Sequence, residues 1–238
     1  MAAIRLDKYL TVACGLSRTE AKEYIRSSRV SIRGVLCRTA DRKIEPATDP
    51  VAVDGIPVQY REHVYIMLHK PAGIVSASKD TREKTVVDLV PPELFRKGLF
   101  PAGRLDRDTT GFVLLTDDGD FAHRILAPGK HVPKTYLVTL TRGISPAENE
   151  LLLAGPALDG EQLQTVRATC MDDEKHIYSV ILLEGRYHQI KRMFAAQGNA
   201  VLALHRIKMG ALALDETLQP GACRLLNDEE LKRITEIT

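Results

Sequence analysis

The sequence lacks several features that define other classes of protein. Its 238 residues include only four cysteines, which lie far apart and form no CxxC pair, so neither a zinc cage nor a redox dithiol is indicated. No apolar run approaches the roughly 18 residues that cross a bilayer, and the first residues lack the apolar core of a signal peptide. We therefore expect a cytoplasmic protein with reduced cysteines.

Motifs for nucleotide and metal chemistry are also missing. The sequence contains no GxxxxGK(S/T) phosphate loop, no GxGxxG after a strand, no HExxH and no GxSxG. Neither a nucleoside triphosphate, a dinucleotide nor zinc is implied, and we expect no cofactor and no metal. No heptad seam or large apolar stripe stands out, so we expect a monomer.

The composition is typical of a folded protein, with 44% hydrophobic and 27% charged residues. The formal net charge of +2 hides an uneven distribution. Residues 1–43 hold ten Lys and Arg against four Asp and Glu, whereas the remainder holds 23 against 27. A cationic segment attached to a nearly balanced body indicates that this segment binds a polyanion, most often nucleic acid.

The cationic segment carries the signals of a helix followed by a hairpin. Ser17 and Glu20 form a capping-box pattern, so a helix should begin there. At 3.6 residues per turn, one face of this helix is apolar and the adjoining face is basic. The basic stripe consists of Arg18, Lys22, Arg26 and Arg29. Such a stripe could also be a solvated face of the helix. The apolar residues that follow the helix favour a hairpin around Arg33–Gly34.

The rest of the chain alternates short apolar runs with turns. The predicted strands are 64–68, 112–116, 136–140, 177–183 and 201–204. The predicted helices are 119–126, 147–153, 188–197 and a last one capped near 227–230. Because strands and helices do not alternate regularly, the pattern indicates an α+β fold around a mixed sheet. A proline-containing connector and a polar segment place a domain boundary near residue 61.

One turn concentrates side chains that can do chemistry. Arg104, Asp106 and Asp108 stand just before the apolar run 112–116. A turn at the end of a strand can project a carboxylate into a cleft while the strand fixes its position. Aspartates in turns also bond local amides, so the spacing alone is compatible with a structural role for both.

This turn is one of four segments that carry a family resemblance. The others are the Pro-Gly turn in Leu68–Gly73, the strand that opens at Lys134–Tyr136, and the basic helix start in Glu184–Met193. In this order, behind a segment that resembles an S4 RNA-binding domain, they resemble the pseudouridine synthases of the RsuA family over essentially the whole chain. The resemblance implies an S4-like RNA-binding domain at 1–60. It also implies a catalytic α+β domain at 61–238, built on a mixed, mainly antiparallel β-sheet with flanking helices.

The resemblance also implies a reaction and the residues that perform it. Pseudouridine formation breaks the N1–C1′ bond of a uridine in RNA, turns the base and rejoins it through C5, which requires no cofactor. Asp106 would be the essential carboxylate, either as a nucleophile at C1′ or as the base that removes the 2′ proton. Tyr136 would lie against the target base, and Lys191 would pair with Asp106 and favour its ionised form.

Further residues are expected to contact the RNA. In the catalytic domain they are Arg104, Arg186, His188, Arg192 and Leu204. In the amino-terminal domain they are Arg5, Lys8, Arg18, Lys22, Arg26 and Arg29. A solvated basic helix end is the alternative for Arg186, His188 and Arg192, for which we favour phosphate contacts. Core packing would explain Leu204 equally well. We interpret Asp108 as a structural turn residue and not as a second catalyst.

The segment 185–193 most resembles family members that modify uridine 516 of 16S rRNA. The predicted partner is therefore ribosomal RNA, either 16S rRNA or an assembling small subunit. A 23S rRNA synthase of the same family and a noncatalytic RNA-binding assembly factor are the alternatives. A glycoside hydrolase is disfavoured, because Asp106 and Asp108 are two residues apart and poorly placed to flank a sugar.

Overall fold

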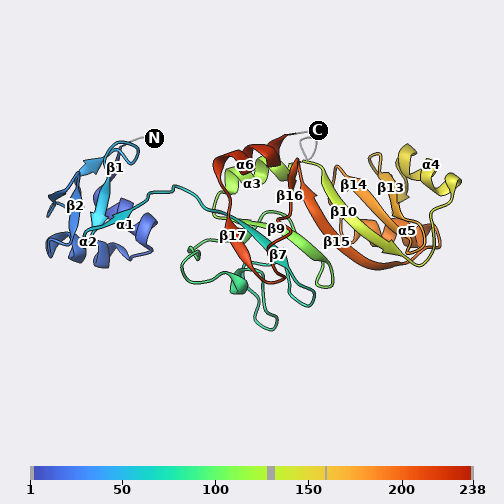
Figure 1. Cartoon of the computed structure of the whole chain (residues 1–238), viewed down its shortest axis with the longest axis horizontal. Coiled ribbons are helices and arrows are strands. Elements are labelled where there is room, and N and C mark those ends of the chain that lie inside the picture. Colours follow the sequence, from blue (N-terminus) through green and yellow to red (C-terminus); the bar gives the residue numbers. More distant parts are fainter. Residues whose placement is uncertain (1–2, 128–131, 159, 237–238) are drawn as a thin grey trace. The chain divides into compact units, whose positions relative to one another are not determined.

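The computed structural model describes residues 3–127, 132–158 and 160–236. The chain divides into two compact units, Met1–His63 and Val64–Thr238 (Figure 1). The first has one hydrophobic core and the second has two.

The amino-terminal unit packs two helices and a small sheet around one core. Helices α1 (Leu6–Cys14) and α2 (Arg18–Arg26) contribute their apolar faces to a cluster that also contains Val30, Ile32 and Val51. The antiparallel sheet has the order β3 (Val35–Leu36), β2 (Val30–Ile32), β5 (Val51–Val53), β6 (Ile56–Val58). A separate pair joins β1 (Ile4–Arg5) to β4 (Lys43–Ile44).

The predicted start of α2 is confirmed, but its predicted basic stripe is too long. The Glu20 amide donates to Ser17 Oγ at 3.2 Å and the Ser17 amide donates to Glu20 Oε2 at 2.7 Å. The helix ends at Arg26, and Ser28 takes a positive φ of 58° that turns the chain toward β2. Arg29 therefore lies beyond the helix, where its guanidinium pairs with Asp54, and the helical stripe is limited to the three earlier cations.

The larger unit is built on a nine-stranded sheet. Its main path has the order β13 (Arg167–Asp172), β14 (Ile177–Leu182), β10 (Lys134–Leu140), β15 (Val201–Met209), β9 (Thr110–Thr116), β7 (Tyr65–Lys70), β17 (Cys223–Leu225). Strand β16 (Leu212–Ala213) pairs with β15, and β8 (Phe100–Pro101) pairs with β9. Only the β9–β15 pairing on this path is parallel, so the sheet among the described residues is mixed and mainly antiparallel, as predicted.

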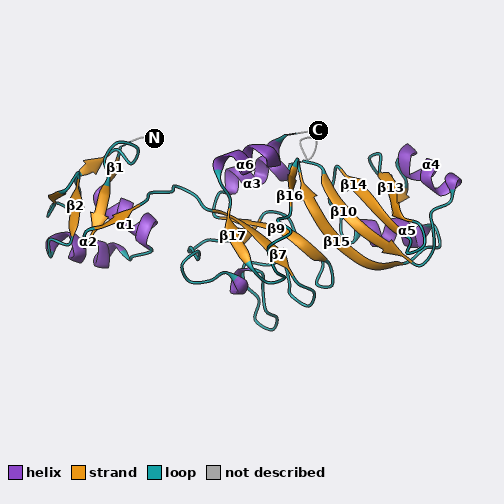
Figure 2. Cartoon of the chain, viewed as in Figure 1, coloured by secondary structure: helices purple, strands orange, loops and turns teal. Residues whose placement is uncertain are grey.

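Helices cover both faces of this sheet (Figure 2). Neighbouring positions along β7 and β9 alternate between two cores, as the two-residue period of a strand requires. Helices α3 (Gly119–Leu126) and α6 (Asp228–Thr235) pack in one core. Helices α4 (Pro146–Ala154) and α5 (Gln189–Ala196) pack in the other. The remaining short elements are η1 (Val87–Leu89) and the pair β11 (Ala157–Leu158) with β12 (Glu161–Gln162).

The predicted helices and strands of this unit are all present, but one strand is longer than predicted and several others were not predicted. Strand β15 continues to Met209, five residues beyond the predicted end, so Leu204 lies inside the strand. The sequence did not indicate β13, an edge strand whose side chains are largely exposed and form no continuous apolar run. It also did not indicate the short strands β8, β11, β12, β16 and β17. Within the ranges described above, no helix combines the length and the apolarity that a membrane crossing needs.

Candidate active site

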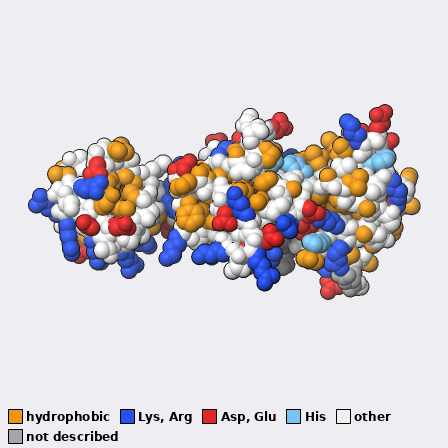
Figure 3. Space-filling model, turned by 90° about the horizontal axis from the view of Figure 1, so that it is seen from below, with side chains coloured by type: hydrophobic (Ala, Val, Ile, Leu, Met, Phe, Trp, Pro, Cys, Tyr) orange, Lys and Arg blue, Asp and Glu red, His pale blue; other side chains and the backbone are white. Residues whose placement is uncertain are grey.

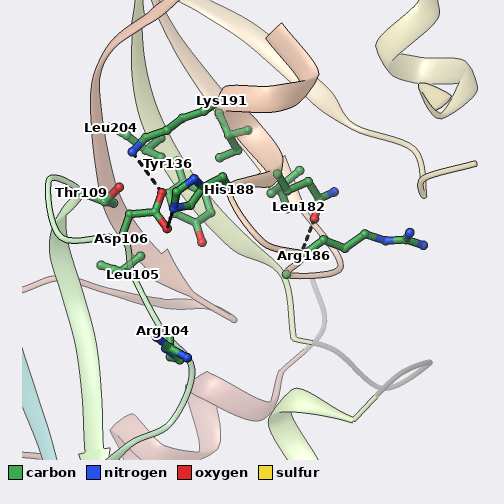
Figure 4. Close-up of a pocket in the computed structure, with 13 residues that line it drawn as sticks. Arg104, Leu105, Asp106, Thr109, Tyr136, Leu182, Arg186, His188, Lys191 and Leu204 are labelled. Carbon is green, nitrogen blue, oxygen red and sulfur yellow. Dashed lines mark hydrogen bonds and ion pairs between the residues drawn. The ribbon is translucent and has the colours of Figure 1, made fainter. Parts of the chain in front are cut away.

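A pocket opens where the loop before β9 faces the start of α5 (Figure 4). Its walls come from five parts of the larger unit, namely this loop, β10, β14, the segment 185–191 and β15. The lining residues are Arg104, Leu105, Asp106, Thr109, Tyr136, Leu182, Gly185, Arg186, His188, Gln189, Ile190, Lys191 and Leu204. The three predicted catalytic residues therefore line one pocket, although they come from different segments of the chain.

The Asp106 carboxylate is the polar centre of this pocket. Its Oδ2 lies 3.1 Å from Lys191 Nζ, and its Oδ1 lies 3.3 Å from His188 Nε2 (Figure 4). The side chain is 23% exposed, so it is sheltered but reachable from solvent. Both oxygens are thus held by groups from one turn and the helix that follows it, while one edge of the carboxylate can meet a ligand.

Lys191 is shared between two carboxylates. Besides Asp106, its Nζ contacts Asp108 Oδ1 at 2.6 Å, and the Asp108 side chain is 73% exposed. Burial alone would lower the pKa of Lys191, but the bonds to the two carboxylates outweigh it and raise the pKa. The bond to Lys191 in turn lowers the pKa of Asp108. The interpretation of Asp108 as a plain turn residue is therefore incomplete, because its carboxylate reaches across to α5.

An apolar surface lies beside the carboxylate. Leu105, Tyr136, Leu182 and Leu204 line the pocket and are each less than 10% exposed. Tyr136 and Leu204 come from β10 and β15, which are paired in the sheet, so their positions are fixed by backbone hydrogen bonds. A flat apolar group that enters the pocket would contact these side chains while its polar edge meets Asp106.

A buried lysine holds the loop that carries Asp106. Lys70 ends β7 and is completely inaccessible to solvent. Its Nζ donates to the carbonyl oxygens of Pro71 at 3.2 Å, Arg107 at 3.1 Å and Thr109 at 2.7 Å. Burial lowers the pKa of this ammonium to about 8, against the pull of the two nearby aspartates. The sequence placed Lys70 in a family segment, but its contact with the loop 39 residues away could not be seen there.

The same loop is fixed at its far end by a glycine. Gly111 has a φ of 104°, and a Cβ at this position would lie 2.3 Å from the backbone oxygen of Arg206 on β15. Beside it, Thr110 Oγ1 hydrogen-bonds with His205 Nδ1 at 2.8 Å. The close approach of β9 to β15 therefore requires glycine at position 111.

The other predicted RNA contacts of this unit differ in how they are placed. Arg104 is exposed on the pocket rim and lies apart from Asp106 in Figure 4. Arg186 points away from the carboxylate and pairs with Glu161 and, at 3.3 Å, with Glu184. Arg192 donates from Nη1 to the carbonyl oxygen of Tyr187 at 3.4 Å. His188 is the one that reaches the carboxylate, a contact that the sequence alone did not indicate.

The predicted contacts of the amino-terminal unit are surface cations. Lys8, Arg18, Lys22 and Arg26 are exposed. Arg5 and Arg29 are also exposed but are paired with Asp7 at 2.8 Å and with Asp54 at 2.5 Å. Figure 3 shows several Lys and Arg side chains along the lower border of this unit. This unit therefore presents fewer unpaired positive charges than its count of basic residues suggests.

Comparisons with known proteins give a consistent answer. The sequence model described as RNA pseudouridylate synthase matches residues 64–196. The chain is 43% identical over 236 residues to the uncharacterized RNA pseudouridine synthase YtzG of Bacillus subtilis, covering 98% of this chain and 99% of that protein. It is 42% identical over 232 residues to the ribosomal small subunit pseudouridine synthase A of Escherichia coli K12, covering 97% and 100%.

A solved structure is similar over nearly the same span. A crystal structure of a pseudouridylate synthase aligns with a TM-score of 0.67 and 38% identity, covering 97% of this chain and 99% of that one. The family match, the full-length relatives and this fold all agree with the resemblance seen in the sequence. The chain therefore belongs to the RNA pseudouridylate synthase family, among the enzymes of the RsuA type.

Proposed function

We propose that this enzyme converts one uridine of small-subunit ribosomal RNA, uridine 516 of 16S rRNA, to pseudouridine, with Asp106 as the catalytic carboxylate. The observation that carries the proposal is the geometry of the pocket, in which Lys191 and His188 hold the Asp106 carboxylate beside an apolar wall. Membership of an enzyme family also disfavours the noncatalytic assembly factor considered from the sequence.

The reaction needs an ionised carboxylate beside C1′ of the ribose. The Lys191 ammonium, 3.1 Å from Asp106, stabilises a negative charge at this position. The carboxylate would then act either by attacking C1′ as N1 leaves or by removing the 2′ proton. In both routes the uracil turns, C5 bonds to C1′, and the hydrogen on C5 is replaced by one on N1, so the product is an isomer.

The freed base has to be kept in the pocket while it turns. Tyr136 is 7% exposed and lines the pocket together with three leucines, which gives the base a water-poor, apolar surface. We propose that the Tyr136 ring lies against the uracil and that its hydroxyl assists removal of the C5 proton. A uridine in folded RNA must be extruded to arrive here, at a cost of a few kcal/mol.

We propose that residues 1–60 form an S4-like RNA-binding domain that offsets this cost. The exposed cations of α2 can contact phosphates and release counterions, which adds affinity without reading sequence. Arg104 on the pocket rim and Arg192 beside the turn at 187 would add contacts near the flipped nucleotide. Arg186 can do so only by exchanging its carboxylate partners for a phosphate.

The small-subunit target is proposed from the E. coli relative, whose name assigns it to the ribosomal small subunit. The test is to map pseudouridine in 16S and 23S rRNA from cells that lack this protein. The deletion strain is complemented with wild type, with Asp106→Asn, or with Asp120→Asn, a matched change of an exposed aspartate at the start of α3.

We expect one pseudouridine to be absent from 16S rRNA in the deletion strain and restored by wild type and Asp120→Asn but not by Asp106→Asn. Loss of a 23S rRNA pseudouridine instead would agree with the proposed activity but would overturn the proposed 16S target. A full set of pseudouridines in the deletion strain would overturn the proposed activity on ribosomal RNA. Restoration by Asp106→Asn would overturn the role of this carboxylate.

A further inference from the structure

An exposed aromatic ring stands directly outside the pocket. Tyr187 is 76% exposed, the highest value among the large apolar and aromatic side chains in the described ranges. It belongs to the turn between β14 and α5, one residue before His188, and it is not among the residues that line the pocket. Burial of an aromatic ring is strongly favourable, so a largely exposed ring beside an active site is a candidate contact for a ligand.

The ring is held in place and is not simply a free side chain. Tyr187 stacks on the His188 imidazole, with ring centroids 3.9 Å apart and an interplanar angle of 17°. The Tyr187 carbonyl accepts a hydrogen bond from Arg192 Nη1 at 3.4 Å. His188 has a left-handed φ of 49°, which is uncommon for a residue with a side chain. Strain of this kind persists where surrounding contacts enforce it, and it is frequent at functional sites.

The stack extends the catalytic centre outward. His188 Nε2 lies 3.3 Å from Asp106 Oδ1. The imidazole of His188 stacks in turn on the exposed ring of Tyr187. Carboxylate, imidazole and phenol therefore follow one another from the pocket to its exterior. A second flat ring placed on the open face of Tyr187 would lie outside the pocket, next to whatever occupies it.

We propose that Tyr187 is a stacking platform for the base of a nucleotide adjacent to the target uridine. The inference rests on the proposed function and names a recognition residue for it. The target base itself is excluded from this place, because Tyr136 and the leucines already form an apolar pocket at Asp106. An unpaired RNA base is the partner that fits, because it is flat, and because it arrives with phosphates that suit the cations of this turn. Stacking accepts any base, so Tyr187 contributes affinity and positioning more than sequence preference.

The first test measures binding and turnover separately. RNA affinity is measured with a 16S rRNA fragment transcribed in vitro, and pseudouridine formation is measured under single-turnover conditions. The variants are Tyr187→Phe, which keeps the ring, Tyr187→Leu, which keeps bulk without a ring, and Tyr187→Ala. Phe95→Ala is the matched control, because Phe95 is 52% exposed in the same unit and does not line the pocket.

We expect Tyr187→Ala and Tyr187→Leu to weaken RNA binding by about 10-fold, within the range that base–aromatic stacking covers. Tyr187→Phe and Phe95→Ala should bind like wild type. Because Tyr187 is so exposed, the three Tyr187 variants should keep the unfolding midpoint of wild type. Unchanged affinity in Tyr187→Ala would overturn the proposal. So would a lower single-turnover rate at unchanged affinity, which would mean that the ring only shields the His188–Asp106 contact.

The second test locates the partner base. Each nucleotide within two positions of the target is replaced in turn by an abasic residue, and binding is measured with wild type and Tyr187→Ala. At the position that stacks, the abasic RNA should bind wild type about 10-fold more weakly, and Tyr187→Ala should add no further loss. Independent effects at every position would overturn the proposal. Failure of the proposed function is distinguishable, because it would appear as absence of pseudouridine in the wild-type reaction.

Discussion

Replacing Lys70 by methionine tests how the loop that carries Asp106 is held. Methionine has a similar length but cannot donate to the carbonyls of Pro71, Arg107 and Thr109, which accept from Lys70 at 2.7–3.2 Å. A buried carbonyl left without a donor costs about 1–3 kcal/mol, while removal of a buried ammonium relieves part of its desolvation. We expect Lys70→Met to lower the free energy of unfolding by about 1–3 kcal/mol at pH 7.

The effect should depend on pH with a defined sign. Burial lowers the pKa of Lys70 from its ordinary value of 10.5 to about 8 in the folded chain. Between these values the unfolded chain binds more protons than the folded chain, so the stability of wild type rises with pH. The variant lacks this titration. The difference in unfolding free energy between wild type and Lys70→Met should therefore widen by about 2 kcal/mol from pH 7 to pH 9.5.

Urea unfolding at pH 7 and pH 9.5 measures this difference, with Lys79→Met as the matched control because Lys79 is exposed on a nearby loop. The control should show no comparable change with pH. The turnover number of Lys70→Met should also fall, since a displacement of about 1 Å at a catalytic group can cost on the order of 100-fold in rate. A stability difference that stays constant or narrows as pH rises would refute the reasoning that Lys70 is buried as an ammonium.

Three further predictions concern the loop, the strand junction and the amino-terminal unit. Asp108→Asn should change the single-turnover rate by less than about 5-fold, because an exposed ion pair contributes at most about 1 kcal/mol. A loss of rate as large as that of Asp106→Asn would contradict this prediction. Gly111→Ala should destabilise the enzyme by about 2 kcal/mol or more in urea unfolding, because its Cβ would meet Arg206 and its φ is positive. Changing Arg18, Lys22 and Arg26 together to Gln should reduce the slope of log affinity against log salt by about 2, and an unchanged slope would remove these cations from the RNA interface.

Local signals predicted the local structure well. The capping box at Ser17 fixes the start of α2, and a capping box at Asn227 fixes the start of α6. Short apolar runs between turns predicted β7, β9, β10 and β14, because these strands are largely buried. The signals failed where solvent replaces the core, as at β13, and where a turn interrupts a helical period, as between Arg26 and Arg29.

The family resemblance named Asp106, Tyr136 and Lys191, and the structure brings all three to one pocket. The contacts that support them were not readable from the sequence. Lys70 reaches Thr109 across 39 residues, and Lys191 reaches Asp108 across 83. Such pairs carry no periodicity, because the strand order that brings them together crosses the chain order several times. Turn propensity is compatible with aspartates at 106 and 108, but it does not indicate which cations their side chains meet.

The geometry of the site follows from one short pairing in the sheet. Strands β9 and β15 run parallel, and they pair only at His205–Thr110 and Arg206–Gly111. The loop that carries Asp106 leaves the sheet just before this pairing, and α5, which carries Lys191, leads into β15 on its other side. The separation of carboxylate and ammonium is therefore set by the β9–β15 contact. A side chain at Gly111 would push these strands apart, and it would impair catalysis without touching Asp106, Tyr136 or Lys191.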